Sequence, residues 1–210
     1  MSNDRELHGL KTAKNSGVAR AERIILGIDP GTTVMGFGVI RTEGPRITLV
    51  EAGCIRFAPG DDHTLKLQAI HRHTTELIER HLPDDLAIEA QFFGKNVQSM
   101  LKLGRAQGVA IAAAIQREVA VREYAPTRIK QSITGHGGAT KEQVAAMLLS
   151  ILGVPELPAS TDATDALAVA VCHQFSQGHA APTPARGGRS GGGGAGWSQF
   201  VRNNPGRVKG

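Results

Sequence analysis

The chain has 210 residues, of which 40% are hydrophobic, which is enough for one core and argues against a chain that is disordered throughout. Apolar runs such as Val109–Ile115 reach only seven residues, far short of the roughly 20 that cross a bilayer, so we expect no membrane partner. The formal net charge is +5, but residues 24–175 contain fourteen Lys and Arg against sixteen Asp and Glu, so the positive excess lies in the two ends. Net charge alone therefore gives no argument for binding nucleic acid.

Composition divides the chain into three parts. Residues 1–23 are polar and aperiodic and are expected to form a mobile N-terminal extension, while residues 24–177 carry the patterning of a compact domain. Residues 178–210 form a basic tail, expected to be disordered because seven of the ten residues 187–196 are Gly. Trp197 lies in this tail, either as a solvated aromatic or as part of a short peptide that docks on a partner or stacks on nucleic acid.

Two cysteines, Cys54 and Cys172, are too few for a disulfide framework, and no Cys/His cluster predicts structural zinc. The chain also shows no secretory signal pattern. Both observations favour a cytoplasmic protein.

In chain order, hydrophobic patterning predicts strands at 24–29, 34–41 and 46–57, a helix at 62–81, a strand at 86–90, a helix at 97–118, a strand at 119–124, and helices at 126–133, 140–152 and 160–175. Pro126 is suited to open a helix, and Thr140 is suited to cap one. Short links between the first three strands favour antiparallel pairing, and the alternation that follows favours parallel pairing. The pattern therefore predicts an α/β layered domain with a mixed sheet.

Four carboxylates stand in apolar surroundings. Asp29 ends the run Ile-Ile-Leu-Gly-Ile-Asp, Glu89 lies in Leu-Ala-Ile-Glu-Ala, and Asp162 and Asp165 begin the last predicted helix. A carboxylate in such a place is costly unless it is paired or coordinated. Residues three apart on a helix share a face, so the two aspartates can point at one spot.

Each carboxylate also has a structural alternative. Asp29 precedes Pro-Gly and can be a turn residue, and Glu89 can be the solvent-facing end of an edge strand. Asp162 can be an N-cap that places Asp165 at the third helical position, where negative charge suits the helix dipole. If all four converge instead, their repulsion demands divalent cations, and oxygen ligands favour Mg²⁺ or Mn²⁺. Two such ions are the apparatus of phosphodiester hydrolysis.

Five segments together resemble the RuvC family of Holliday junction resolvases, in order and with suitable spacing over about residues 24–175. They are Ile-Leu-Gly-Ile-Asp-Pro-Gly-Thr (25–32), Ala-Ile-Glu (87–89), Met-Leu-Lys-Leu-Gly-Arg-Ala-Gln-Gly-Val (100–109), Tyr124 through Gln131, and Asp-Ala-Thr-Asp-Ala-Leu-Ala (162–168). The resemblance implies an RNase H-like fold, with a central mixed five-stranded sheet flanked by helices. Neither end of the chain is part of it.

The same resemblance implies a function, which is the metal-dependent, paired nicking of four-way DNA junctions by a homodimer in recombination and repair. It makes Asp29, Glu89, Asp162 and Asp165 the catalytic and metal-binding acids, with Asp29 shared between two Mg²⁺ ions, for which Mn²⁺ can substitute. It also implies the branch-migration proteins RuvA and RuvB as partners.

Basic and aromatic residues are the candidate DNA contacts. The resemblance places Lys130 and Lys141 near the scissile phosphate, although solvated lysines on helix faces are the structural alternative. Lys95, Lys102 and Arg105 are candidates for the same side.

The pair Phe92 and Phe93 follows Glu89 closely. The resemblance makes Phe92 the aromatic that faces the junction, where it would stack on an unpaired base, and we expect Phe93 to be inside the core. The alternative is that both fill the core beneath the loop.

Two other classes of function share parts of this pattern. A strand followed by Asp-Pro-Gly-Thr also begins ATPases and sugar kinases of the actin-like fold, but these need a second lobe, for which the compact region is too short. A junction-binding protein without catalysis is disfavoured because all four acids are present.

Overall fold

The computed structural model describes residues 22–90 and 96–177, which form a layered α/β fold. The strands are β1 (Arg23–Asp29), β2 (Val34–Glu43), β3 (Arg46–Arg56), β4 (Asp85–Glu89) and β5 (Ala120–Tyr124). The helices are α1 (His63–His81), α2 (Val97–Gln116), α3 (Pro126–Thr134), α4 (Lys141–Leu152) and α5 (Thr161–Gln177). Outside the described residues lie the predictions for Phe92, Phe93, Lys95, Trp197 and the two ends of the chain.

The strands form one mixed sheet in the order β3-β2-β1-β4-β5. The pairs β1–β2 and β2–β3 are antiparallel, and the pairs β1–β4 and β4–β5 are parallel. The turn between β2 and β3 contains Gly44 at φ 60°, a left-handed conformation that glycine adopts without strain. This turn lets β2 continue to Glu43, two residues beyond its predicted end at Arg41. The predicted five-stranded mixed sheet is confirmed.

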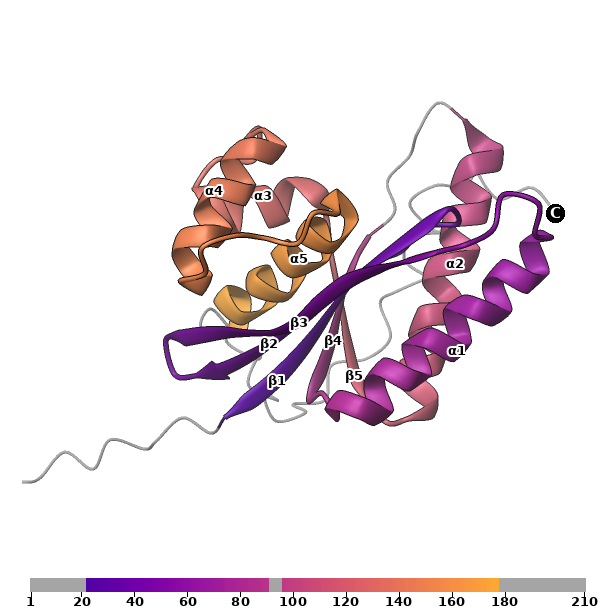
Figure 1. Ribbon diagram of the computed structural model, residues 1–210, viewed down its shortest axis with the longest axis horizontal. Helices are drawn as coiled ribbons and strands as arrows, with labels where there is room; N and C mark the ends of the chain where they lie inside the picture. The colour runs from indigo at the N-terminus through magenta and orange to yellow at the C-terminus, as the bar shows by residue number, and fades with distance from the viewer. Residues whose placement is uncertain (1–21, 91–95, 178–210) are drawn as a thin grey trace, which may run out of the picture. The chain divides into compact units, whose positions relative to one another are not determined.

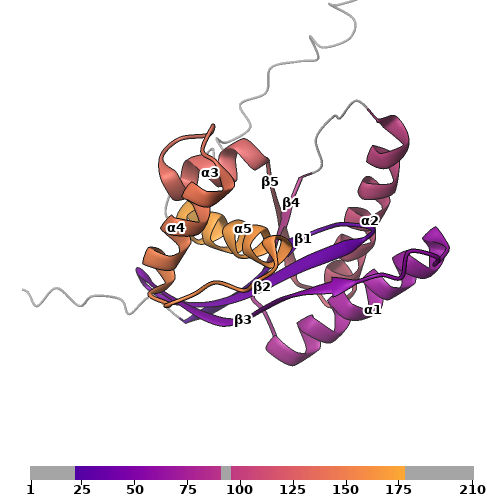
Figure 2. The ribbon, with the colours of Figure 1, turned by 45° about the horizontal axis from the view of Figure 1, so that its top comes forward.

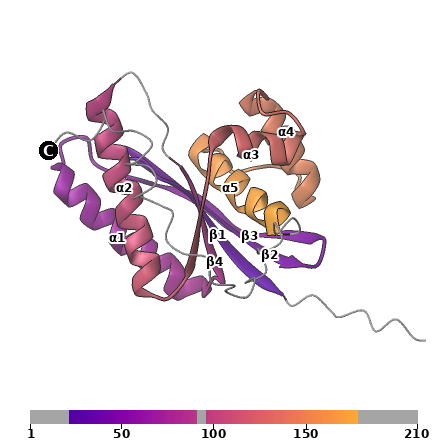
Figure 3. The same cartoon turned by 180° about the vertical axis from the view of Figure 1, so that it is seen from behind.

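Helices cover both faces of the sheet, with α3, α4 and α5 on one face and α1 and α2 on the other (Figure 1, Figure 2 and Figure 3). Side chains of β1 alternate between the two layers: Ile25 belongs to the core beneath α3–α5, whereas Leu26 and Ile28 belong to the core beneath α1 and α2. By this alternation Asp29 faces the side of α5. None of the described helices combines the length and the apolar composition needed to span a membrane.

Helix α5 lies directly on the backbone of β1 and β2 because glycines line its path. A Cβ added at Gly27 would lie 2.2 Å from the carbonyl oxygen of Ala166, and one at Gly38 would lie 2.8 Å from the Leu167 side chain. The helix itself is rich in fully buried alanine and valine. Small residues on both elements therefore fix the depth of α5 against the sheet.

One edge of the sheet collects the ends of the parallel strands. Ile28 of β1 pairs with Ile88 of β4, so Asp29 and Glu89 leave neighbouring strands side by side. Helix α2 follows the end of β4 and therefore starts near this edge. Helix α1 ends just before β4 begins, at the opposite end of the strands, so its start also lies near this edge (Figure 1).

Candidate active site

Asp29 and Glu89 end two neighbouring strands, and their surroundings perturb both carboxyl groups. The pKa of Asp29 is raised from 3.8 to about 7. Burial is the largest cause, followed by repulsion from Glu89, Asp165 and Asp162. Burial and the charge of Asp165 also raise the pKa of Glu89. Strand β4 lies between β1 and β5, so the alternative that Glu89 belongs to an edge strand is wrong.

Asp162 and Asp165 project from the start of α5. The helix begins at Thr161, and the carbonyl oxygen of Ser160 accepts the first helical bond, from the N–H of Thr164 at 3.2 Å. Ser160 rather than Asp162 is therefore the N-cap, so the capping alternative for Asp162 and Asp165 is wrong. The hydroxyl of Ser160 donates to Oδ2 of Asp162 at 3.1 Å and so restrains that carboxylate.

Gly36 brings the start of α5 to the end of β1. It pairs with Asp29 across the β1–β2 ladder, and a Cβ at this position would lie 1.9 Å from the carbonyl oxygen of Asp162. The close approach of Asp162 to Asp29 thus requires glycine here. No role for Gly36 was predicted from the sequence, although glycines at alternate positions of a strand are a usable signal for a closely packed backbone.

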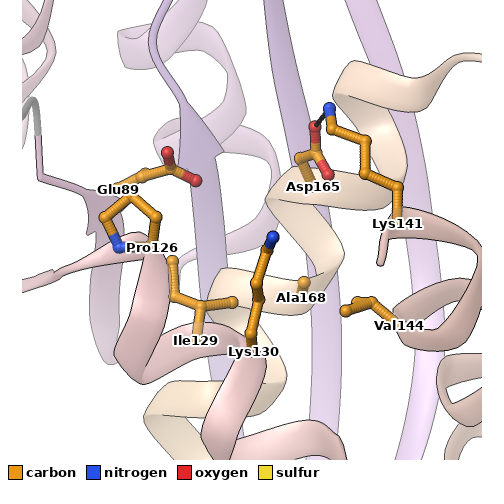
Figure 4. A pocket seen from close by; sticks show the side chains of 8 residues that line it. All are labelled: Glu89, Pro126, Ile129, Lys130, Lys141, Val144, Asp165 and Ala168. Atoms are coloured by element: carbon orange, nitrogen blue, oxygen red, sulfur yellow. Dashed lines mark hydrogen bonds and ion pairs between the residues drawn. The ribbon is translucent and has the colours of Figure 1, made fainter. Parts of the chain in front are cut away.

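A cavity of about 240 Å³ lies beside the acids (Figure 4). Its lining comprises Glu89, Pro126, Ile129, Lys130, Lys141, Val144, Asp165 and Ala168. The Nζ of Lys141 donates to Oδ2 of Asp165 at 2.6 Å, a contact that raises the pKa of Lys141. In Figure 4 the ammonium group of Lys130 points between Glu89 and Asp165, and its charge opposes the rise in the pKa of Glu89. Acidic and basic side chains therefore line the same cavity.

Helix starts place the two lysines. Thr140 caps α4 as predicted: its hydroxyl accepts the N–H of Gln143 at 3.3 Å, and the Gln143 side chain accepts the N–H of Thr140 at 2.9 Å. This capping box makes Lys141 the first residue of α4. Pro126 opens α3 as predicted, which puts Lys130 one turn into that helix.

The other candidate DNA contacts lie elsewhere. Lys102 and Arg105 are exposed on α2 and do not line the acid-containing cavity. Lys102 lines a separate recess with Thr32 and Lys66. Helix α2, which carries Lys102 and Arg105, lies on the opposite face of the sheet from α5 (Figure 3). The order of residues in the sequence does not show this separation.

The donor set fits a divalent metal ion. In residues 22–90 and 96–177, no three His, Cys, Asp or Glu side chains are already gathered closely enough to hold one ion. Burial, together with repulsion from the other three acids, nevertheless raises the pKa of Asp29 to about 7, and a cation among the acids would offset both effects. Carboxylate oxygens are hard ligands, which suit Mg²⁺ or Mn²⁺.

Comparison with known proteins gives one consistent result. Residues 25–173 match the family described as "Crossover junction endodeoxyribonuclease RuvC". A protein of that description from Cytophaga hutchinsonii is 55% identical over 188 residues, covering 90% of this chain and 89% of the relative. Another, from Christiangramia forsetii, is 48% identical over 200 residues, covering 95% of this chain and all of the relative.

A solved structure is similar as well. T. thermophilus RuvC in complex with a Holliday junction substrate is 35% identical to this chain and superposes with a TM-score of 0.70, covering 74% of this chain and 94% of that chain. The fold is therefore RNase H-like, as the resemblance implied. The chain belongs to the RuvC family of crossover junction endodeoxyribonucleases, which are metal-dependent nucleases.

Proposed function

We propose that this chain resolves four-way (Holliday) DNA junctions by paired, symmetric hydrolysis of phosphodiester bonds in recombination and repair. The observation that carries the proposal is the convergence of four acids, beside two lysines, at one edge of the sheet; the acids are Asp29, Glu89, Asp162 and Asp165. The similar T. thermophilus RuvC was solved with a junction substrate, which supports the same substrate here.

The four acids would hold two Mg²⁺ ions, or Mn²⁺ in their place, with Asp29 shared between the two positions. When bound, the pair of ions supplies an activated water and stabilises the charge of an in-line displacement at phosphorus. Asp29 serves as a ligand only when ionised, so its raised pKa sets a competition between protons and metal. Ser160 keeps the Asp162 carboxylate in place through the hydrogen bond to its Oδ2.

The two lysines would hold the scissile phosphate. Lys141 already lies against Asp165, and the Lys130 ammonium group points into the same cavity (Figure 4). Both provide hydrogen-bond donors and positive charge to a phosphate oxygen. Apolar side chains of Ile129 and Val144 complete the lining and limit the water around these charges.

Phe92 and Lys95 complete the proposed DNA contacts, although they lie outside the described residues. Phe92 would stack on a base at the opened junction, and Lys95 would contact a phosphate. Replacing Phe92 with Ala should then slow cleavage with little change in thermal stability. A large loss of stability with normal cleavage per folded molecule would place Phe92 in the core instead.

Two symmetric nicks require two active sites, which a twofold dimer provides. Helix α2 offers an exposed stripe for this contact, formed by Leu101, Gly104, Gly108, Ala112 and Ile115. Leu101 and Ile115 are 51% and 64% exposed, and a Cβ at either glycine would meet no described atom. A second copy of this chain would bury the stripe, and analytical ultracentrifugation at micromolar concentration should therefore report a dimer.

The partners RuvA and RuvB and a cytoplasmic location follow from the same proposal, because a resolvase must meet junctions on cellular DNA. The two described cysteines, Cys54 and Cys172, are free thiols, which is compatible with a reducing compartment. Co-purification of the tagged chain with either branch-migration protein on a synthetic junction tests this part.

The decisive experiment uses a four-way junction labelled on each strand, with a linear duplex of the same sequence as the competing substrate. In Mg²⁺ the parent should nick two opposed strands of the junction and spare the duplex, and EDTA should stop the reaction. The variants Asp29→Asn, Glu89→Gln and Asp165→Asn should bind the junction but cut it at rates near background. Glu156→Gln, a change at an exposed acid away from the cavity, should cut like the parent. Hydrolysis of ATP in place of junction cleavage would favour the actin-like alternative.

A further inference from the structure

A second polar recess, of about 200 Å³, lies apart from the acid-lined cavity. Its lining consists of Thr32, Pro59, Asp61, His63, Lys66 and Lys102. Three segments contribute these residues: the turn after β1, the connection from β3 into the first turn of α1, and the first half of α2. Proline is the only lining residue without a polar side chain.

The two lysines that line the recess are not paired with acidic groups among the described residues. Within the described part of the chain, Lys66 and Lys102 form no side-chain hydrogen bond or ion pair, and Asp61 is the one acid among the lining residues. The neighbouring Asp62 instead caps α1 by accepting an N–H of its first turn. The Nε2 of His63 is buried and has no hydrogen-bond partner among the described residues. A buried ring nitrogen of this kind calls for a partner, and an anion carrying oxygen atoms supplies one.

The position of the recess relates it to the acids. Thr32 follows Asp29 by three residues, in the turn that leads from β1 to β2. Helices α1 and α2 both start at this edge of the sheet, on the face opposite α5 (Figure 1). A polyanion that lies across the edge therefore meets the acids on one side of β1 and the lysines on the other.

We propose that this recess binds a backbone phosphate of the junction, at a position other than the bond that is cut. Lys66 and Lys102 supply the charge, and Thr32 and His63 supply hydrogen-bonding groups. With Asp61 the net charge of the two lysines and the acid is +1, which matches the single negative charge of one phosphodiester. The inference rests on the proposed function, because it takes the ligand to be the DNA that the acids cut.

Paired charge removals test the site. The double variant Lys66→Gln/Lys102→Gln is compared with Arg46→Gln/Arg122→Gln, which removes the same charge from exposed positions on β3 and β5. Binding of a fluorescent four-way junction is measured in EDTA between about 50 and 200 mM salt. The lysine variant should bind about 3- to 10-fold more weakly, with a salt slope lower by about 1 to 2, while cleavage at saturating protein stays normal. The arginine variant should stay within about 2-fold of the parent. Equal effects in the two variants contradict the proposal.

Replacing single phosphates of the junction with a neutral linkage identifies the phosphate that the recess contacts. Methylphosphonates are placed one at a time along the junction strands, and parent binding should weaken at a position away from the cut bond. At that position the lysine variant should lose no further affinity, because the two changes remove the same contact. Additive losses at every position overturn the proposal.

Two controls separate this proposal from the proposed function. Thermal unfolding should show that the lysine variant is as stable as the parent. A parent that neither binds nor cuts the junction contradicts the proposed function and this proposal together. A parent that binds and cuts, while the lysine and arginine variants behave alike, contradicts this proposal alone.

Discussion

Replacing Asp29 with Asn should stabilise the protein without metal while abolishing its activity. Asp29 is largely buried and faces Glu89, Asp162 and Asp165, and its pKa of about 7 means that the folded state resists ionising it. The rise from 3.8 corresponds to at most about 4 kcal/mol at neutral pH, at roughly 1.4 kcal/mol per unit. The Asn amide must also be buried, so we expect a net gain of about 1–3 kcal/mol.

The pH dependence of this gain has a definite sign. A carboxyl group whose pKa is higher in the folded state than in the unfolded state favours folding while it is protonated. The contribution of Asp29 to parent stability is therefore present below pH 3.8 and is lost progressively as the pH rises to about 7. The advantage of Asp29→Asn should grow by up to about 1.4 kcal/mol per pH unit across this window and level off above it.

Urea denaturation between pH 4.5 and 8 in EDTA measures this difference, because equal slopes and a shifted midpoint report a change in stability alone. In excess Mg²⁺ the advantage of the variant should shrink: at about 100 times its dissociation constant, a bound ion stabilises the parent by about 2.7 kcal/mol, and the variant lacks one ligand. Glu156→Gln, at an exposed acid, is the matched control. The reasoning is refuted if Asp29→Asn gains no stability at pH 8, or gains the same amount at every pH.

Three further changes test the geometry of the site. Gly36→Ala should lower stability by about 1–3 kcal/mol or more, because its Cβ would lie 1.9 Å from the Asp162 carbonyl oxygen; urea midpoints and cleavage per folded molecule measure this. Asp162→Asn should slow cleavage without lowering the urea midpoint, and an unaltered rate would contradict its role as a ligand. Lys141→Met should slow cleavage at saturating DNA. It should also shift the rising part of the pH–rate profile to higher pH, because Lys141 lowers the pKa of Asp29. An unshifted pH–rate profile would contradict this coupling.

The sequence predicted the layers of this fold well, because local signals agreed with the tertiary structure. Pro126 and Thr140 began helices where expected, and the apolar run that ends at Asp29 marked a strand, which packs on both faces. The glycine turn that extends β2 to Glu43 was missed, because the strand pattern fades before the turn.

The site was harder to predict, because its geometry depends on contacts distant in sequence. Asp162 is a residue type that commonly caps helices, and the hydrogen bond from Thr164 to the Ser160 carbonyl decides that Ser160 is the N-cap instead. Gly36 acts through a helix that begins more than a hundred residues later. Lys102 was grouped with the active-site lysines, although the sheet separates it from them. The spatial convergence of the acids had to await the structure.

Single-turnover cleavage of a labelled four-way junction by the parent and by Glu89→Gln, each in Mg²⁺ and in EDTA, is the sharpest test of whether these acids hold a catalytic metal. Glu89 ends the interior strand β4 and lines the cavity, and the change removes one charge with almost no change in size. We predict paired nicks on opposed strands by the parent in Mg²⁺ alone, and a folded Glu89→Gln variant that binds the junction without cutting it. Cleavage by that variant at the parent rate, or by the parent in excess EDTA, would contradict metal-dependent cleavage at these four acids.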